Sequence, residues 1–204
     1  MLWFKDYLSD RKQAVVLSGQ TSSYQTVEAG VPQGSVLGPT LFLVYINDIV
    51  HEIESVIKLF ADDTNVYLSL DDPRQRAKIL NGDLWLIDEW SRIRKVSFNP
   101  IKTKLVNFSR KINEIYEPLT FSGELLSNST IHKHLGITFQ SDCKWNSHLT
   151  NLASKCRVLV SVLKSFKYRL SRKSLEIVLK SFIFPQFVYG DVIWVTALKS
   201  YQMK

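Results

Sequence analysis

The chain has 204 residues, of which 45% are hydrophobic, and its formal net charge is +7. This composition is typical of a folded domain and excludes an intrinsically disordered chain. The apolar runs are shorter than the roughly 18 residues that a membrane-spanning helix needs, the N-terminus has no secretory signal, and two cysteines are too few for a disulfide framework. We therefore expect an intracellular protein of the nucleus or cytoplasm, without a membrane partner.

The first fifty residues predict a short helix, two strands and a longer helix. The predicted ranges are, in chain order, a helix that ends near residue 9, strands over 13–17 and 24–28 joined by the turn Ser18-Gly19-Gln20-Thr21, and a helix over 36–50. Ser35 is the expected N-cap of the longer helix. Pro39 falls in its first turn, where a proline is tolerated.

Between residues 51 and 139 the pattern predicts a hairpin, a helix and further short strands. The hairpin strands cover 56–61 and 65–70, and Asp62-Asp63-Thr64 forms the turn between them. Asp71-Asp72-Pro73 is typical of a helix N-terminus and predicts a helix that ends near Ile93. The further strands are predicted over residues 104–109, 119–121 and 135–139.

The last third is predicted to be helical and basic. Apolar side chains recur there at alternating spacings of four and three residues, which indicates one long helix with an apolar stripe: Trp145, Leu149, Leu152, Cys156, Leu159, Leu163 and Phe166. A second helix is expected from Arg172 to Phe184, ending at Pro185. From residue 141 onward, 11 Lys or Arg oppose 3 Asp or Glu, whereas residues 1–140 carry 15 against 16. This charge fits a nucleic-acid partner or a solvated helical surface, and charge alone favours neither.

Asp62-Asp63 is the pair that could carry chemistry. Adjacent carboxylates in a tight turn repel each other unless a cation is bound, and Mg²⁺ takes hard oxygen ligands. Phosphoryl-transfer enzymes use two such ions, roughly 3.5–4 Å apart, to clamp the attacking and leaving oxygens. Taken alone, the pair is more simply explained as a polar turn, and Asp71-Asp72 is interpreted in that way.

A series of motifs surrounds this pair. The segments are, in chain order, Val31-Pro32-Gln33-Gly34-Ser35-Val36-Leu37-Gly38-Pro39, Leu41-Phe42-Leu43-Val44-Tyr45-Ile46-Asn47-Asp48, Phe60-Ala61-Asp62-Asp63, Asn99-Pro100-Ile101-Lys102-Thr103-Lys104, His134-Leu135-Gly136 with Trp145 and His148, and Ile183 to Trp194. Over essentially the whole chain, this series resembles the reverse transcriptases of non-LTR (LINE-like, Jockey-type) retrotransposons. Phe60-Ala61-Asp62-Asp63 is similar to their paired-aspartate box.

The resemblance implies an α+β fold and a polymerase activity. Residues 1–139 would form a partial palm, with an antiparallel sheet and packed helices, and residues 140–204 a basic helical thumb. The implied function is that of an RNA-directed DNA polymerase acting by two-metal nucleotidyl transfer. Its cofactor would be Mg²⁺ or Mn²⁺, and its partners an RNA template, a DNA primer and dNTPs.

The resemblance also assigns roles to individual positions. The implied set comprises Asp62 and Asp63 as catalytic metal ligands, Gln33, Gly34 and Lys102 at the template and nucleotide, and His134, Leu135 and Gly136 at the primer end. Several of these residues have structural alternatives. Gly34 could simply serve a turn, Lys102 could be a solvated lysine, and Leu135 could belong to the core.

The sequence departs from the family at an earlier palm motif. That motif supplies another catalytic aspartate in a Phe-Asp context, which is absent here, and the fingers are missing too. Asp6, Asp10 and Asp48 are the remaining acidic candidates, and none is expected to replace it. We therefore expect a truncated reverse transcriptase that is inactive alone, with the missing palm and fingers as its natural packing partner, unless the reading frame begins upstream.

Two other functions remain open. The chain could be a non-catalytic nucleic-acid-binding remnant, whose affinity would fall with rising salt and would not respond to Asp62→Asn. It could also be an expressed remnant without a selected role. An incomplete palm would expose strand edges, which predicts poor solubility for the isolated chain.

Overall fold

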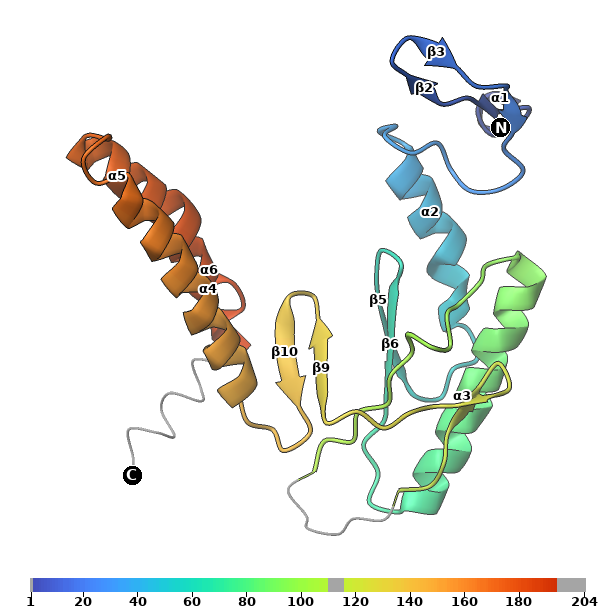
Figure 1. Ribbon diagram of the computed structural model, residues 1–204. Coiled ribbons are helices and arrows are strands. Elements are labelled where there is room, and N and C mark those ends of the chain that lie inside the picture. The colour runs from blue at the N-terminus through green and yellow to red at the C-terminus, as the bar shows by residue number, and fades with distance from the viewer. Residues whose placement is uncertain (1, 110–115, 194–204) are drawn as a thin grey trace. The chain divides into compact units, whose positions relative to one another are not determined.

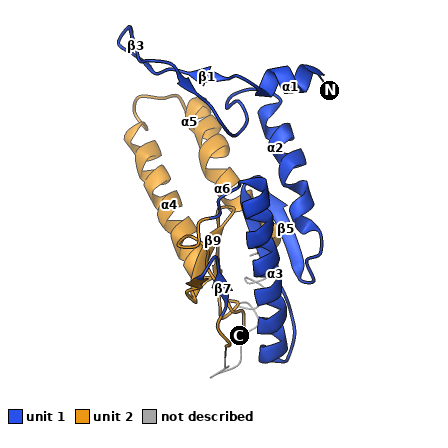
Figure 2. Ribbon diagram, turned by 90° about the vertical axis from the view of Figure 1, so that its right-hand side faces the viewer, with its two compact units in different colours: residues 1–98, 119–123 blue, residues 99–118, 124–204 orange. Residues whose placement is uncertain are grey.

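Figure 1 shows the computed structural model of the chain, which describes residues 2–109 and 116–193. The chain divides into two compact units, coloured separately in Figure 2. Unit 1 comprises Met1–Phe98 and Leu119–Gly123, and unit 2 comprises Asn99–Pro118 and Glu124–Lys204. Both units combine helices with two-stranded antiparallel ribbons, so the predicted α+β class is confirmed. The finer division into a palm and a thumb stays a prediction.

Unit 1 begins with helix α1 and an interrupted hairpin. The elements are α1 (Leu2–Leu8), β1 (Lys12–Gln13), β2 (Val16–Leu17), β3 (Gln20–Thr21) and β4 (Gln25–Thr26), with β1 paired to β4 and β2 to β3. The first predicted strand, 13–17, is therefore broken into β1 and β2. The returning side starts earlier than predicted, because β3 lies inside the predicted turn and only β4 lies within the predicted strand 24–28. At the break, Ser22 Oγ accepts a hydrogen bond from Val15 N–H at 3.0 Å, so a side chain replaces a ladder carbonyl. The turn consists of Ser18 and Gly19, whose positive φ values suit a type I′ turn.

Helix α2 (Gly38–Ile46) starts two residues later than predicted and continues as the 3-10 helix η1 (Asn47–Val50). The expected N-cap, Ser35, is wrong, because the N-cap is Leu37, which makes no side-chain capping bond. Ser35 Oγ still accepts a hydrogen bond from Gly38 N–H at 3.0 Å, just before the helix. A Cβ atom at position 38 would lie 2.7 Å from the carbonyl oxygen of Pro32. The close approach of the preceding loop therefore requires glycine at this position.

The rest of unit 1 is built on helix α3 (Pro73–Arg94), which confirms the predicted helix and extends it by one residue. Asp72 is its N-cap and accepts a hydrogen bond from Arg74 N–H at 3.0 Å. The hairpin strands β5 (Val56–Phe60) and β6 (Asp63–Tyr67) precede α3, and β7 (Thr120–Phe121) packs against it. The buried apolar residues of this unit are Ile46, Ile49, Ala77, Leu84, Ile87, Leu119 and Phe121.

Unit 2 contains a hairpin and a group of helices. Its elements are β8 (Glu124–Leu125), β9 (Ile131–His134), β10 (Ile137–Gln140), α4 (Asn146–Ser165), α5 (Arg172–Val178) and α6 (Phe184–Val188). The apolar stripe predicted on α4 is confirmed as the core of the unit except at Phe166, which is exposed, and Leu152 and Cys156 are buried together with Ile183. The partly buried residues around them are Trp145, Leu149, Leu159, Val160, Leu163 and Leu179. Within the described part of the chain, every helix is too short or too polar to span a bilayer.

Pro185 does not end the second helix of unit 2, contrary to the prediction. Between α5 and α6 the backbone forms a π-helical turn, η2 (Leu179–Ile183), in which Phe184 N–H donates to the carbonyl of Leu179, five residues earlier. A proline inside an α-helix removes a hydrogen bond and collides with the carbonyl four residues before it. The wider π turn accommodates the ring, so the helical path continues through Pro185.

Two predicted strands of unit 2 are corrected by the structure. The strand predicted over 104–109 is wrong, because the described residues form only an isolated parallel bridge there, between Leu105 and Asn128. Side chains that favour β-structure form a strand only where a partner strand is available. The strand predicted over 135–139 begins at Ile137 instead, because the two residues before it form a turn.

Candidate functional site

Asp62 and Asp63 lie at the tip of the β5–β6 hairpin. The antiparallel pairing extends to the last residue of β5 and the first residue of β6, so the turn consists of Ala61 and Asp62 alone. The hairpin is confirmed, but the prediction placed its turn over residues 62–64, one residue too late. Asp62 is therefore a turn residue, and Asp63 already belongs to a strand.

The turn has an unusual backbone. Ala61 has a φ of +51°, whereas Asp62 does not have a positive φ, and this sign pattern is that of a type II′ turn. Glycine is the usual residue at the first position of such a turn. A left-handed backbone costs an L-residue roughly 1–2 kcal/mol, so the paired strands must hold Ala61 in this conformation.

The hairpin tip is open to solvent. Ala61, Asp62 and Asp63 are all exposed, and Phe60 beside them is 61% exposed. Burial alternates along β5, with one face half-buried and the other exposed. Both carboxylates can therefore meet a cation or a nucleotide that arrives from solvent.

The donor chemistry of this pair fits Mg²⁺, a hard cation that prefers oxygen ligands in an octahedral shell. Asp62 and Asp63 would fill part of that shell. Among residues 2–109 and 116–193, no group of three or more His, Cys, Asp or Glu side chains is arranged to hold a metal ion. Further ligands would come from water, from the phosphates of a nucleotide or from additional protein groups.

Asp48 has a structural role, as its place at the end of a predicted helix indicated. Trp90 donates its indole N–H to Asp48 Oδ1 at 2.8 Å, and Arg94 forms an ion pair with the same carboxylate. The indole hydrogen bond is the main reason why the pKa of Asp48 lies below its usual value, and the charge of Arg94 lowers that pKa further. These contacts tie η1 to α3. The other two acidic candidates, Asp6 and Asp10, are exposed on and just after α1.

Asp83 is a residue that the sequence reasoning missed. It is only 3% exposed, and its two carboxylate oxygens accept hydrogen bonds from Glu54 N–H at 3.0 Å and Ser55 N–H at 2.8 Å. These two residues directly precede β5, so α3 holds the base of the hairpin that carries the paired aspartates. One sequence feature could have identified Asp83 as a buried anchor: it is an acidic residue on the apolar face of a predicted helix, between Ala77 and Ile87.

Gln33 and Gly34 are exposed residues of a tight turn in unit 1. Ser35 N–H donates to the carbonyl of Pro32 at 3.4 Å, and Gly34 has a φ of +77°. A type II turn needs such a φ at its third residue, which is why glycine is found there. The structural explanation of Gly34 is therefore confirmed, and the role of both residues at the template and nucleotide stays a prediction.

The remaining predicted residues belong to unit 2. Lys102 is exposed, and its N–H donates to Asn99 Oδ1 at 3.1 Å. His134 ends β9, and Leu135 and Gly136 form the two-residue turn to β10 with φ values of +46° and +81°. Leu135 is therefore not a core residue, because the turn leaves it 36% exposed. A single site that combines residues of both units stays a prediction.

Residues 1–159 match the reverse transcriptase (RNA-dependent DNA polymerase) family. The chain is 30% identical to the RNA-directed DNA polymerase from mobile element jockey of Drosophila melanogaster, over 98% of this chain and 23% of that protein. It is 28% identical to the jockey protein of Drosophila funebris, with the same coverage, and 28% identical to the probable RNA-directed DNA polymerase from transposon X-element of Drosophila melanogaster, over 97% of this chain and 22% of that protein. No solved structure is significantly similar to the chain.

These similarities confirm the resemblance to Jockey-type non-LTR retrotransposon polymerases. The chain spans about a quarter of the length of these relatives, 22–23% in each alignment. The paired aspartates, the Gln-Gly turn and the β9–β10 turn all lie within the residues matched by the family. The chain belongs to the reverse transcriptase (RNA-dependent DNA polymerase) family.

Proposed function

We propose that this chain forms part of the RNA-directed DNA polymerase of a Jockey-like non-LTR retrotransposon, and that Asp62 and Asp63 bind its catalytic divalent cations. The observation that carries the proposal is the position of both carboxylates at the exposed tip of an antiparallel ribbon. Polymerases need closely spaced carboxylates because the metal ions must approach the phosphates of a nucleotide. The proposed substrates are an RNA template, a DNA primer and a dNTP.

The cofactor would be Mg²⁺ or Mn²⁺. When bound, the ions would neutralise the charge that develops on the transferred phosphoryl group. The chain itself contributes the placement of the ligands. The β5–β6 pairing holds Asp62 and Asp63 as neighbouring residues at one tip, and Asp83 fixes the base of that hairpin to α3.

The other predicted residues complete this proposal. Gln33 and Gly34 would lie near the templating base and the incoming nucleotide, where a glycine lets the backbone approach closely. Lys102 would contact the triphosphate, and residues 134–136 would hold the primer end. In this scheme residues 1–139 belong to the palm and residues 140–204 to the thumb, and the protein works in the nucleus or cytoplasm.

The metal proposal can be tested by paramagnetic line broadening. Mn²⁺ added to the 204-residue chain should broaden the NMR signals of residues 60–64 first. Asp62→Asn and Asp63→Asn should each remove most of this effect, because each deletes a charged ligand. Asp71→Asn is the matched control, since Asp71 also belongs to an exposed pair of adjacent aspartates. Equal broadening at both pairs, or broadening that survives the double substitution at 62 and 63, would reject the metal site.

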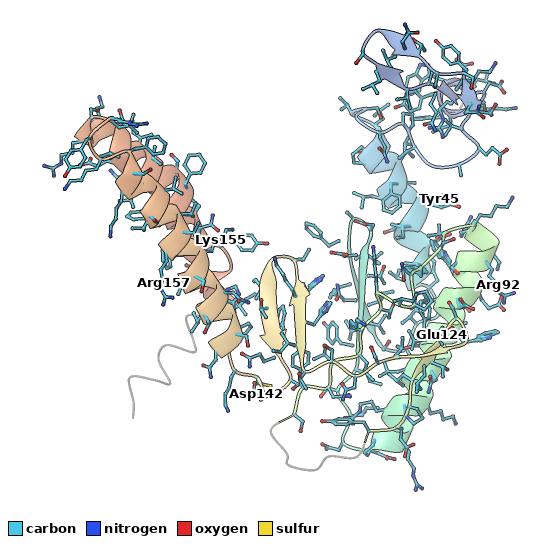
Figure 3. All side chains as sticks on the ribbon, in the orientation of Figure 1. Tyr45, Arg92, Glu124, Asp142, Lys155 and Arg157 are labelled. Atoms are coloured by element: carbon cyan, nitrogen blue, oxygen red, sulfur yellow. The ribbon has the colours of Figure 1, made fainter. Side chains whose placement is uncertain are left out.

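A second candidate function is binding of nucleic acid without catalysis. It is favoured by the exposed cations of α4, α5 and the segment between them: Lys155, Arg157, Lys164, Lys167, Arg169, Arg172 and Lys173. Lys155 and Arg157 project from α4 in Figure 3, and Lys167 lies 5.4 Å from the ring centroid of Tyr168, which is 91% exposed. Cations beside an exposed aromatic ring suit a phosphate backbone with unpaired bases.

The two functions differ in their dependence on metal. A binder without catalysis should retain its affinity for an RNA–DNA duplex after Asp62→Asn and in the presence of a chelator. The logarithm of its association constant should fall linearly with the logarithm of the salt concentration, because each phosphate contact releases counterions. Template-directed incorporation of a dNTP that is lost on Asp62→Asn would instead support the polymerase.

A further inference from the structure

The turn between β9 and β10 is in contact with a distant part of the chain. Tyr189 donates its hydroxyl to the carbonyl of Leu135 at 2.5 Å, across 54 positions of sequence. Its ring also lies against Gly136, because a Cβ atom at that position would be 3.1 Å from Tyr189 Cε1. One aromatic side chain therefore contacts both residues of the turn, although both stay exposed to solvent.

The next residue extends this contact. Gly190 has a φ of +67°, and a Cβ atom there would lie 2.5 Å from Cδ1 of Ile137, the first residue of β10. Ile137 is itself buried, so it has little room to move away. Glycine is thus required both by the backbone conformation and by the close approach to the hairpin. Tyr189-Gly190 fits residues 135–137 as one unit.

Tyr189 is held by the helices of unit 2. It follows α6 directly, and its N–H donates to the carbonyl of Pro185 at 3.0 Å. Before α6, Ile183 lies in the same buried cluster as Leu152 and Cys156 of α4. A continuous series of contacts therefore leads from the core of the unit to the β9–β10 turn.

Strand β10 of the same hairpin makes its own contacts with α4. His148, on α4, accepts a hydrogen bond on Nδ1 from Thr138 N–H at 3.3 Å, and Gln140 Oε1 accepts one from Ser147 N–H at 2.7 Å. The start of α4 thus fixes β10, whereas Tyr189 fixes the turn. Removing the Tyr189 contact should loosen the turn without releasing the hairpin.

We infer that Tyr189 and Gly190 are positioning residues that hold the turn formed by Leu135 and Gly136 in the shape that contacts a primer end. This inference rests on the proposed function, because the primer role of residues 134–136 belongs to it. Tyr189 acts through the turn by fixing the direction of the Leu135 carbonyl and closing one side of Gly136. Gly136 adopts its positive φ without strain, but the positive φ of Leu135 is unfavourable for a leucine, so support from Tyr189 stabilises the turn at that residue.

The first test measures the order of the turn without nucleic acid. Tyr189→Phe removes one hydroxyl and keeps the ring, and Tyr168→Phe is the matched control because Tyr168 is 91% exposed on the segment between α4 and α5. Amide hydrogen exchange at residues 134–137, followed by NMR, should accelerate about three- to tenfold in Tyr189→Phe, as expected for one lost hydrogen bond. It should not change in Tyr168→Phe. Unchanged exchange in both variants would overturn the inference.

A pair of substitutions tests the glycine contact. Gly190→Ala should loosen the turn, and adding Ile137→Val should restore part of its order, because valine lacks the Cδ1 atom that the new Cβ would meet. Gly123→Ala is the control for backbone strain alone, since Gly123 has a φ of +80° but no atom lies within 4 Å of the position that its Cβ would take. If Gly190→Ala speeds amide exchange in the turn and adding Ile137→Val does not slow it at all, the contact between these two positions is contradicted.

The final test uses an RNA template annealed to a DNA primer, either with a recessed primer 3′ end or blunt. The wild-type chain should prefer the recessed end, and Tyr189→Phe should weaken that Kd about three- to tenfold while the Kd for the blunt duplex stays the same. A wild-type chain without preference would reject the primer role itself, and the exchange data would still decide whether Tyr189 orders the turn. A preference that survives Tyr189→Phe would reject the positioning role alone.

Discussion

The backbone N–H of Ser55 donates to Oδ2 of Asp83 at 2.8 Å, although 28 positions separate the two residues in the sequence. Ser55 directly precedes β5, and Asp83 is buried on α3. A single carboxylate thus connects the base of the paired-aspartate hairpin to the main helix of unit 1. The placement of Asp62 and Asp63 depends on this buried residue as well as on their own strands.

Asp83→Ala should lower the free energy of unfolding by about 2–4 kcal/mol, because it leaves two buried N–H groups without an acceptor. Asp83→Asn should lower the free energy of unfolding by less, since the one remaining side-chain oxygen still accepts a hydrogen bond. Urea denaturation followed by circular dichroism measures both values. Asp71→Ala, at an exposed position, should stay within roughly 0.5 kcal/mol of the wild type. A loss for Asp83→Ala no larger than that of the control would contradict the anchoring role.

Asp48→Asn should lower the free energy of unfolding by about 1 kcal/mol at neutral pH, because the partly exposed carboxylate exchanges its hydrogen bond and ion pair for weaker contacts. The pKa of Asp48 lies below its usual value in the folded state. Its contribution is therefore present above pH 3.8, the usual value, and is lost as the pH falls through the folded pKa. Broadening of residues 60–64 by Mn²⁺ should not change in this variant. A loss of that broadening would make Asp48 a metal ligand.

The stability of unit 2 should decrease in mild acid because of His148. Burial lowers the pKa of His148 below 6.5, its usual value, so the unfolded chain takes up a proton more readily than the folded one. The contribution of the neutral ring is complete above pH 6.5 and is lost as the pH falls through the folded pKa. His148→Asn, which keeps an acceptor near the position of Nδ1, should flatten this dependence. His51→Asn, at an exposed site, should leave it intact in thermal melts between about pH 5 and 8.

Ala61→Gly should stabilise the β5–β6 hairpin by up to about 1 kcal/mol, because glycine adopts a positive φ without strain, although it also adds entropy to the unfolded chain. Ala61→Val should destabilise it, because a β-branched side chain is poorly tolerated there. Urea denaturation of both variants measures the difference. The same stability for glycine and valine would show that Ala61 does not have a left-handed backbone in solution.

The 204 residues alone should not extend a DNA primer on an RNA template with Mg²⁺. Two aspartates from one hairpin fill only part of a two-metal site, and these 204 residues do not contain the Phe-Asp motif that the resemblance implies for a further catalytic aspartate. A primer-extension assay with labelled primer measures this directly. Robust extension that disappears in Asp62→Asn would show that these residues suffice for catalysis.

The local elements were predicted well wherever neighbouring residues decide the backbone. Asp72 caps α3 as its place before Pro73 indicated, and the stripe on α4 forms a core because its spacing matches a helical turn. The errors occur where a distant partner decides. Residues 104–109 have the composition of a strand but find a single bridge, and Pro185 is accommodated by a π turn that no local pattern predicted.

The sequence by itself determined the family, the paired aspartates and the hairpin that carries them, because motif order and local backbone preferences depend on residues that are close together in the sequence. The tertiary structure alone decided how that hairpin and the β9–β10 turn are held. Asp83 and Tyr189 act over 28 and 54 positions of sequence, and such contacts depend on where helices and strands meet in space. The residues next to Asp83 or Tyr189 in the sequence do not indicate which distant residue each will contact. Only the folded chain therefore reveals these two contacts.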